Sequence, residues 1–310
     1  MGAYLIRRLL VAIPMLVVVS FLTFLLIHLS PMDPAEVVLH AQGVPVPTDS
    51  LIAQTRVELG LNDPLWVRYA KWAADCLRLD FGRSYVTGEA VWTLVGPAFL
   101  HTLQLTLASS AAIIAASILL GVACAVQAGK LLDRSSRGIA FVLTAMPSYW
   151  LASLLIWLVA VKLDLLPTSG MDSWASFILP VLVMTLGYAG IYFRTVRSSM
   201  LSQLHEGYAL YGRASGLSEA VVTRHIARNS LQVAIAVFGM AVPTILGSTV
   251  VIENVFAWPG LGRLGVKAIL SRDLPIIQAY VFIVAVSFVM FNAMADLLQA
   301  ALNPRLRKEL

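Results

Sequence analysis

The sequence is poor in the residues that make covalent and metal cross-links. It has two cysteines in 310 residues, Cys76 in a polar segment and Cys124 in an apolar one, and no Cys-x-x-Cys pair. We therefore expect no disulfide and no zinc or redox centre. The five histidines show no spacing of four residues and lie on different segments, which argues against a metal site in this chain.

Motifs for nucleotide binding and catalysis are also missing. At Gly129-Lys130, Cys124 stands where a P-loop needs its first glycine, and Leu131 stands where serine or threonine should follow the lysine. Without a P-loop the chain cannot bind ATP in the usual way. No Ser-His-Asp set, carboxylate pair or metalloprotease helix is present. We expect no catalytic residue and no cofactor in this chain.

Three glycines, Gly260, Gly262 and Gly265, spell Gly-x-Gly-x-x-Gly. A dinucleotide site needs a strand before this pattern and a helix after it, within an α/β unit. Here the pattern follows Trp258-Pro259 at the end of an apolar run. We interpret the glycines as part of a tight outer loop that lies against the membrane domain.

Charge is scarce along the chain. Charged residues make up 13% of it, whereas 59% is hydrophobic, and the mean hydropathy is +0.81. This balance is typical of an integral membrane protein. The net charge of +5 would suggest nucleic acid as the partner of a soluble chain. Because the basic residues lie between apolar runs, they indicate membrane topology instead, and we expect membrane lipid and no nucleic acid as partners.

Six apolar runs are long enough to cross a bilayer, which takes about 20 helical residues. They lie at about 9–29, 98–128, 138–162, 175–193, 231–252 and 275–301. The loops rich in Lys and Arg, together with the basic tail, fall on one side, and by the positive-inside rule both termini are predicted to be cytoplasmic. The loop at 253–274 is an exception, because it is basic and predicted to lie outside. Pro147, Pro180 and Pro243 are expected to interrupt spans three, four and five.

The chain divides by composition into four parts. We expect an N-terminal transmembrane helix at 1–30, retained as a signal anchor. An extracytoplasmic insertion at 31–95 follows, and its eight acidic and five basic residues place it outside. The membrane core covers 96–302 and contains a cytoplasmic loop at 195–230. A cytoplasmic tail at 303–310 completes the chain.

The segment 206–232 is the longest polar, basic interruption in the second half of the chain. A short amphipathic helix is predicted from Tyr208 to Ser215. Gly216 suits the left-handed residue that ends a helix, and Ser218 is a good N-cap for the next one. This unit of two helices joined at a glycine, placed outside the membrane, is suited to binding by another protein.

This segment resembles the EAA loop of ABC-importer permeases, the cytoplasmic element that docks on the ATP-hydrolysing subunit. The resemblance is carried by Tyr208, Ala209, Arg213, Ala214, the central Gly216-Leu217-Ser218 and the returning Arg228-Asn229. It implies these ATPase-coupling residues: Glu206, Gly207, Tyr208, Ala209, Gly212, Arg213, Ala214, Gly216 and Leu217. Gly207, Leu210 and Ser215 stand where the peptide-importer branch more often has an acid and two bases, so docking is expected to rely on shape more than on ion pairs. An ordinary Arg-rich cytoplasmic loop is the alternative.

Other stretches extend the resemblance along nearly the whole chain, to permeases of the dipeptide/oligopeptide/nickel family. They are Leu59-Gly-Leu-Asn-Asp-Pro-Leu65, Met146-Pro-Ser-Tyr-Trp150, Ile252-Glu-Asn-Val-Phe-Ala-Trp-Pro-Gly-Leu-Gly-Arg263 and Asn303-Pro-Arg-Leu-Arg307. The family implies an all-α, type I (MetI-like) permease core with six transmembrane helices in the bacterial cytoplasmic (inner) membrane. It also implies partners: a second homologous permease, expected to form a heterodimer, two subunits that bind ATP and Mg, and an extracytoplasmic solute-binding protein.

The insertion and the stretch Phe256-Ala-Trp-Pro-Gly260 are most similar to nickel and metal-chelate (opine metallophore) permeases, which implies a metal cargo. A dipeptide or oligopeptide importer is the alternative within the family. A secondary transporter, a channel or a membrane scaffold are the alternatives outside it.

The resemblance also gives candidates for the substrate path, because this region borders the path in the family. They are Glu253, Asn254 and Trp258. The acid Glu253 would favour a cationic cargo, whereas a role in capping the outer loop would not. Asp296, inside the last apolar run, is a second ionisable candidate, or else an anchor that pairs with Arg305.

Overall fold

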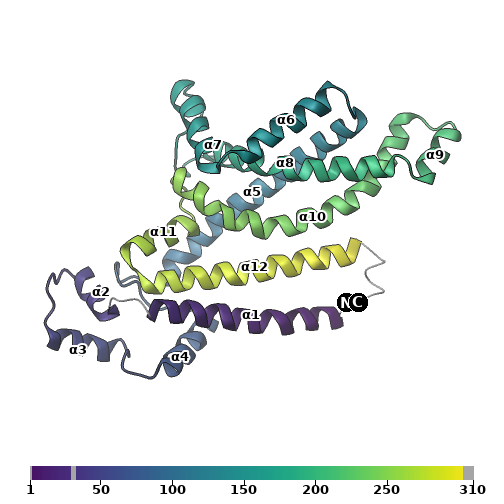
Figure 1. The fold of residues 1–310 in the computed structure, drawn as a ribbon. Helices are drawn as coiled ribbons and strands as arrows, with labels where there is room; N and C mark the ends of the chain where they lie inside the picture. The colour runs from purple at the N-terminus through teal and green to yellow at the C-terminus, as the bar shows by residue number, and fades with distance from the viewer. Residues whose placement is uncertain (1, 29–32, 303–310) are drawn as a thin grey trace. The chain divides into compact units, whose positions relative to one another are not determined.

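The computed structural model describes residues 2–28 and 33–302, and the regular structure of this part of the chain is helical apart from one isolated bridge between Arg83 and Ala90. The α-helices, drawn in Figure 1, are α1 Gly2–His28, α2 Pro34–Ala41, α3 Asp49–Glu58, α4 Leu65–Leu77, α5 Val91–Val126, α6 Leu131–Ala145, α7 Ser148–Leu155, α8 Ile178–Gln203, α9 Gly207–Ala214, α10 Glu219–Val255, α11 Leu261–Ser271 and α12 Leu274–Leu302. A π-helix, Ile156–Lys162, follows α7, and a 3-10 helix, Trp174–Phe177, precedes α8. The predicted all-α class is confirmed.

The chain folds as two compact units. Of the described residues, 2–102 and 259–289 form the N-terminal unit, and 103–258 and 290–302 form the C-terminal unit. The predicted boundaries at residues 30 and 95 both fall inside the N-terminal unit, and the predicted tail 303–310 lies outside the described residues.

Four helical stretches are long and apolar enough to cross a membrane: Val91–Val126, Trp174–Gln203, Val237–Val255 and Leu274–Leu297. Leu131–Ala145 and Ser148–Lys162 together make a fifth if this pair, bent by 105°, is one span. Within α1, Leu10–Leu25 is a shorter apolar stretch. The several membrane helices are confirmed, and the count of six stays a prediction.

The bend between α6 and α7 has a local cause. Met146 has an extended backbone with ψ 134°, and Pro147 occupies the N-cap position of α7. Proline has no N–H for the helical ladder and disfavours helical geometry in the residue before it. Pro180 lies in the first turn of α8, where its N–H is not needed, and α10 continues past Pro243. An interruption is therefore confirmed at Pro147 alone among the three predicted prolines.

Glycines bring the helices of the C-terminal unit into close contact. A Cβ on Gly121 of α5 would lie 2.6 Å from Cβ of Val196 in α8. A Cβ on Gly190 of α8 would lie 2.8 Å from Cγ2 of Thr144 in α6. Since lipid provides no hydrophobic drive between membrane helices, close packing at small residues contributes to holding them together.

The glycine-rich stretch after Trp258 is a helix, which corrects the predicted outer loop. Gly260 is the N-cap residue of α11, and Gly262 and Gly265 lie inside this helix. A Cβ on Gly265 would lie 2.9 Å from the ring of Tyr280 in α12. The glycines therefore allow two helices of the N-terminal unit to approach each other.

Candidate functional site

The segment between α8 and α10 has the predicted order of helix, glycine and helix. Its first helix, α9, covers Gly207–Ala214, one residue earlier at each end than predicted. Gly216 has φ +78°, a left-handed conformation that glycine adopts without strain. Ser218 is the N-cap residue of α10, but its side chain makes no capping hydrogen bond. The predicted conformation of Gly216 is thus confirmed.

The inner face of α9 is held by a small apolar cluster. Ala209 of α9 packs with Met200 of α8 and with Val222 and Ile226 of α10, and each of these side chains is at most 3% exposed. Ala125 completes the cluster. Because these side chains interlock, α9 is seated directly on the last turns of α8 and the first turns of α10.

Arg213 links α9 to the start of α10. Its Nε donates to Glu219 Oε1 at 2.9 Å, which joins α9 to the first turn of α10. The Glu219 side chain is 71% exposed, so this ion pair is worth about 0–1 kcal/mol at most. Shape, more than this pair, sets the position of α9.

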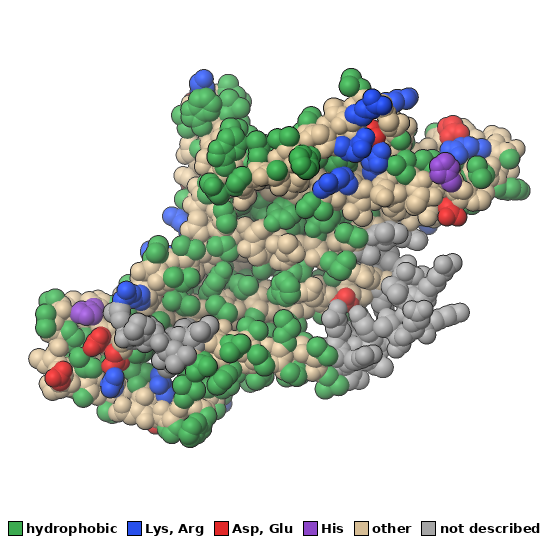
Figure 2. All heavy atoms as spheres, viewed as in Figure 1, with side chains coloured by type: hydrophobic (Ala, Val, Ile, Leu, Met, Phe, Trp, Pro, Cys, Tyr) green, Lys and Arg blue, Asp and Glu red, His purple; other side chains and the backbone are tan. Residues whose placement is uncertain are grey.

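The outer side of α9 and of the turn that follows it is apolar and exposed. Tyr211 is 75% exposed, Leu210 54% and Leu217 48%, and Figure 2 shows hydrophobic side chains at the outer end of the segment that Figure 1 labels α9. An exposed apolar patch is a candidate surface for contact with another protein. The arrangement fits docking by shape.

The predicted coupling residues all lie in this one segment. Ala209 and Gly212 are buried, and Arg213 is partly buried. The others are exposed: Glu206, Gly207, Tyr208, Ala214, Gly216 and Leu217. Their part in ATPase coupling stays a prediction.

An ion pair with a buried carboxylate, between α6 and α8, was not found by sequence reasoning. Asp133 in the first turn of α6 has no exposed surface. Arg197 of α8 donates to it twice, from Nε to Oδ1 at 2.6 Å and from Nη2 to Oδ2 at 2.8 Å. The backbone N–H of Gly129, before α6, donates to Oδ2 at 2.9 Å. The sequence did contain a signal for this pair. Asp133 is the one acid in a loop with three basic residues, and such an acid can be expected to pair with a basic side chain.

Basic side chains surround this pair. Figure 2 shows Lys and Arg gathered where α6 begins and α8 nears its end; these segments contain Lys130, Arg134, Arg137, Arg194 and Arg197. Arg137 also reaches Asp133, with Nε 3.4 Å from Oδ1. It lies four residues along the same helix, so this contact joins no second element.

The substrate-path candidates lie at the end of α10. Glu253 has no exposed surface, and Trp258 has none either, its ring meeting Phe177 edge-on at 4.5 Å between centroids. Asn254 is exposed, and its side-chain amide donates to the Val250 carbonyl at 2.8 Å. The backbone N–H of Trp258 donates to the Glu253 carbonyl at 2.8 Å. Two of the three candidates thus lie in the interior, and their contact with a substrate stays a prediction.

The second ionisable candidate, Asp296, lies in α12 and is partly buried. Its suggested partner Arg305 is outside the described residues. Among the described residues, no three His, Cys, Asp or Glu side chains are grouped so that they could hold a metal ion.

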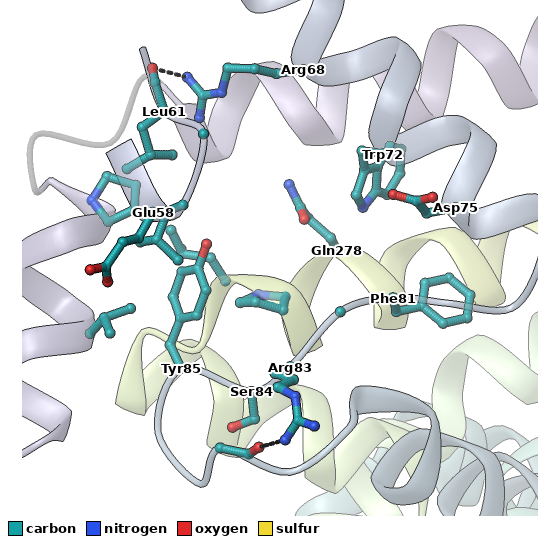
Figure 3. A pocket seen from close by; sticks show the side chains of 18 of the residues that line it. Glu58, Leu61, Arg68, Trp72, Asp75, Phe81, Arg83, Ser84, Tyr85 and Gln278 are labelled. Atoms are coloured by element: carbon teal, nitrogen blue, oxygen red, sulfur yellow. Dashed lines mark hydrogen bonds between the residues drawn. The ribbon is translucent and has the colours of Figure 1, made fainter. Parts of the chain in front are cut away.

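A cavity of about 720 Å³ with both polar and apolar side chains in its lining lies within the N-terminal unit, mostly in the part predicted as an outer insertion. Figure 3 shows Gln278 pointing to its middle, with Tyr85 and Trp72 on either side. Gln278 is 8% exposed. Arg68 lies at the rim and donates to the Leu61 carbonyl at 3.4 Å. A cavity with such a lining suits solvent or a small polar solute; sequence reasoning singled out no site here.

Comparison with known families gives two matches that together cover nearly the whole chain. Residues 117–308 match the family described as "Binding-protein-dependent transport system inner membrane component". Residues 1–106 match its N-terminal companion, "Binding-prot-dependent transport system membrane comp, N-term".

Curated relatives are similar over nearly their full length. The metal-staphylopine import system permease protein CntB of Staphylococcus aureus (strain NCTC 8325 / PS 47) is 52% identical over 99% of both chains. The glutathione transport system permease protein GsiC of Escherichia coli (strain K12) is 36% identical over 98% of both chains.

Solved structures share the fold at low identity. The MetNI methionine ABC transporter in inward-facing conformations matches with a TM-score of 0.58 and 18% identity, over 68% of this chain and 96% of that one. An amino acid ABC transporter with histidines matches with a TM-score of 0.54 and 15% identity, over 67% of this chain and 94% of that one. The predicted MetI-like permease fold is confirmed.

Proposed function

Because the chain belongs to the family of inner-membrane components of binding-protein-dependent transport systems, we propose that, as the permease subunit of an ABC importer, it carries a metal chelate of the opine type. The observation that carries the cargo class is the 52% identity, over 99% of both chains, to a permease named for metal-staphylopine import. The lower identity of 36% to a glutathione permease makes a peptide cargo the second candidate.

Coupling to ATP hydrolysis is assigned to α9 and the start of α10. The chain itself holds no nucleotide; two partner subunits bind ATP and Mg. The exposed apolar face of Leu210, Tyr211 and Leu217 docks on such a subunit, and the buried cluster around Ala209 transmits its movement to α8 and α10. The left-handed Gly216 sets the angle between the two helices.

The transport cycle follows from this coupling. Closure of the two ATPases displaces α9 and opens the path outward, where the solute-binding protein releases its cargo. Hydrolysis of ATP then resets the path. The path is formed with a second homologous permease, and we assign the pair as a heterodimer.

We also assign α9 and both chain termini to the cytoplasm. The exposed Lys130, Arg134 and Arg137 precede or begin α6, as expected for a cytoplasmic loop under the positive-inside rule. The residues 31–95 then lie outside, where they meet the solute-binding protein.

Uptake assays test the proposal. Cells that lack the chain receive it back together with its partner subunits, and uptake of radiolabelled nickel–staphylopine chelate, free nickel, a labelled dipeptide and labelled glutathione is compared. We expect chelate uptake that disappears when the partner ATPase is made defective. If only dipeptide or glutathione is taken up, the cargo is a peptide and not a metal chelate. Uptake that persists with a defective ATPase would indicate a secondary transporter or channel.

A further inference from the structure

A buried carboxylate joins α6 to α8 within the C-terminal unit. Arg197 holds both oxygens of Asp133, at 2.6 and 2.8 Å, while Asp133 has no exposed surface. A two-pronged guanidinium–carboxylate pair fixes orientation as well as distance, which a single hydrogen bond does not. At this point the two helices cannot turn relative to each other without breaking the pair.

A second contact fixes the same two helices further along. A Cβ on Gly190 would lie 2.8 Å from Cγ2 of Thr144 and 3.1 Å from Cβ of Ala140. Gly190 precedes Arg197 by seven residues, which is about 10 Å along a helix. Two fixed points at this separation make α6 and α8 move as one body.

The same part of α8 carries α9. Met200 lies three residues beyond Arg197, about one helical turn, and packs with Ala209 of α9. Only residues 204–206 separate the two helices. A displacement of α9 therefore reaches Arg197 through one turn of α8.

The other end of α6 leads to the bend. The helix ends at Ala145, and the next one, from Ser148, departs at 105°. Because Pro147 has no N–H, the ladder is already open there, so the angle can change without loss of a helical hydrogen bond. The π-helix Ile156–Lys162 that follows is a conformation found often at functional sites.

We propose that Asp133 and Arg197 are positioning residues that carry the displacement of α9 into the bent pair α6–α7, so that docking on the ATPase changes the angle at Pro147. This rests on the proposed coupling role of α9. The continuous route is α9, the Met200 cluster, α8, the Asp133–Arg197 pair, α6 and the bend.

The test compares transport with ATP hydrolysis in the reconstituted importer, with both permeases, both ATPases and the binding protein in proteoliposomes. The quantity measured is nickel–staphylopine chelate transported per ATP hydrolysed. The main variant is the double substitution Asp133→Leu/Arg197→Met. It removes the pair without leaving a buried charge, and such apolar replacements are often neutral for stability.

We expect the double variant to assemble in normal amounts and to keep its basal ATPase rate. Its transport per ATP should fall about fivefold or more, the lower end of coupling between two sites in a protein. The matched control is Arg137→Gln. It removes a half-exposed positive charge near the Asp133 carboxylate but leaves the contact between α6 and α8 in place. It should keep the ratio.

The proposal is overturned if the double variant transports with the normal ratio, or if Arg137→Gln lowers the ratio equally. If the double variant does not assemble, Arg197→Lys decides, because it keeps the charge and loses the two-pronged geometry; a normal ratio there likewise overturns the proposal. A failure of the proposed function looks different: chelate is then not transported even by the unmodified importer, or Gly216→Val transports normally.

Discussion

At the residue scale, the burial of Glu253 affects the role that its side chain can have in transport. Sequence reasoning placed it beside the substrate path, and the structure gives it no exposed surface at the end of α10. An ionised carboxylate acts at a distance, since two unit charges about 6 Å apart at an effective dielectric of about 20 interact by roughly 3 kcal/mol. An effect of this charge on a cationic cargo therefore does not require contact.

Substitution at this position separates the two roles. Glu253→Gln keeps size and hydrogen bonding and removes the charge, so we expect slower uptake of a cationic metal chelate and unchanged uptake of a neutral dipeptide. Uptake rates are corrected for the amount of complex in the membrane. Glu253→Ala is the comparison: if only this variant has an effect, and it affects every cargo, Glu253 is a structural cap.

At the scale of the element, Gly216 decides the angle between α9 and α10. A β-branched residue is disfavoured at φ +78°, and such strain costs about 1–3 kcal/mol. Nothing lies within 4 Å of the position of its Cβ, so the penalty is conformational and not a clash. We expect Gly216→Val to abolish transport while the protein still inserts in the membrane.

Asparagine provides the control at the same position, because it tolerates the left-handed conformation better than other non-glycine residues. Gly216→Asn should retain most of the transport. Transport assays with matched expression check both variants, and equal loss in both would show that the glycine is needed for a different reason.

The contact between α5 and α8 gives a second prediction for an element. A methyl group at Gly121 would meet Val196 Cβ at 2.6 Å and the Phe193 carbonyl oxygen at 3.0 Å. Overpacking of this kind costs about 1–3 kcal/mol. Gly121→Ala should therefore lower the thermal stability of the detergent-solubilised protein.

Gly187 on α8 is the matched glycine without neighbours within 4 Å. Gly187→Ala should be neutral or stabilise the helix, by up to about 1 kcal/mol. Melting curves of the two variants are compared with that of the unmodified protein. A similar melting temperature for both alanine variants would show that α5 and α8 are not in tight contact.

At the scale of the whole molecule, topology is tested from the two sides of the membrane. Cys76 itself is a poor probe, because burial first, and then the carboxylates of Asp75 and Asp80, raise its pKa to about 12. The reactive thiolate is then scarce at neutral pH. Exposed positions on the insertion and on the α9 segment serve better.

In a chain with both cysteines replaced by alanine, Thr87→Cys should react with an impermeant maleimide on intact cells. Ser215→Cys should react only after the cells are opened. Both side chains are exposed, so a difference between them reports sidedness and not burial. Labelling in the reverse order would invert the proposed topology.

The local pattern of residues was sufficient for the class of protein and for the segment between α8 and α10. Apolar runs of membrane length predict membrane helices because backbone groups in lipid must bond within their own helix. Gly216 and Ser218 predict where one helix ends and the next begins, because the positions of helix ends follow local conformational preferences. These properties depend on neighbours in sequence, so the sequence alone determined them.

Only the tertiary structure decided which distant residues meet. Asp133 and Arg197 are 64 residues apart, so no local preference can pair them. They meet because α6 packs closely on α8 at Gly190. The glycines after Trp258 were expected to form a loop; instead Gly260 is the N-cap residue of α11, and Gly265 lies inside this helix, where a Cβ would meet the ring of Tyr280 in α12 at 2.9 Å. The burial of Glu253 likewise arises from packing of whole helices, which local sequence patterns do not encode.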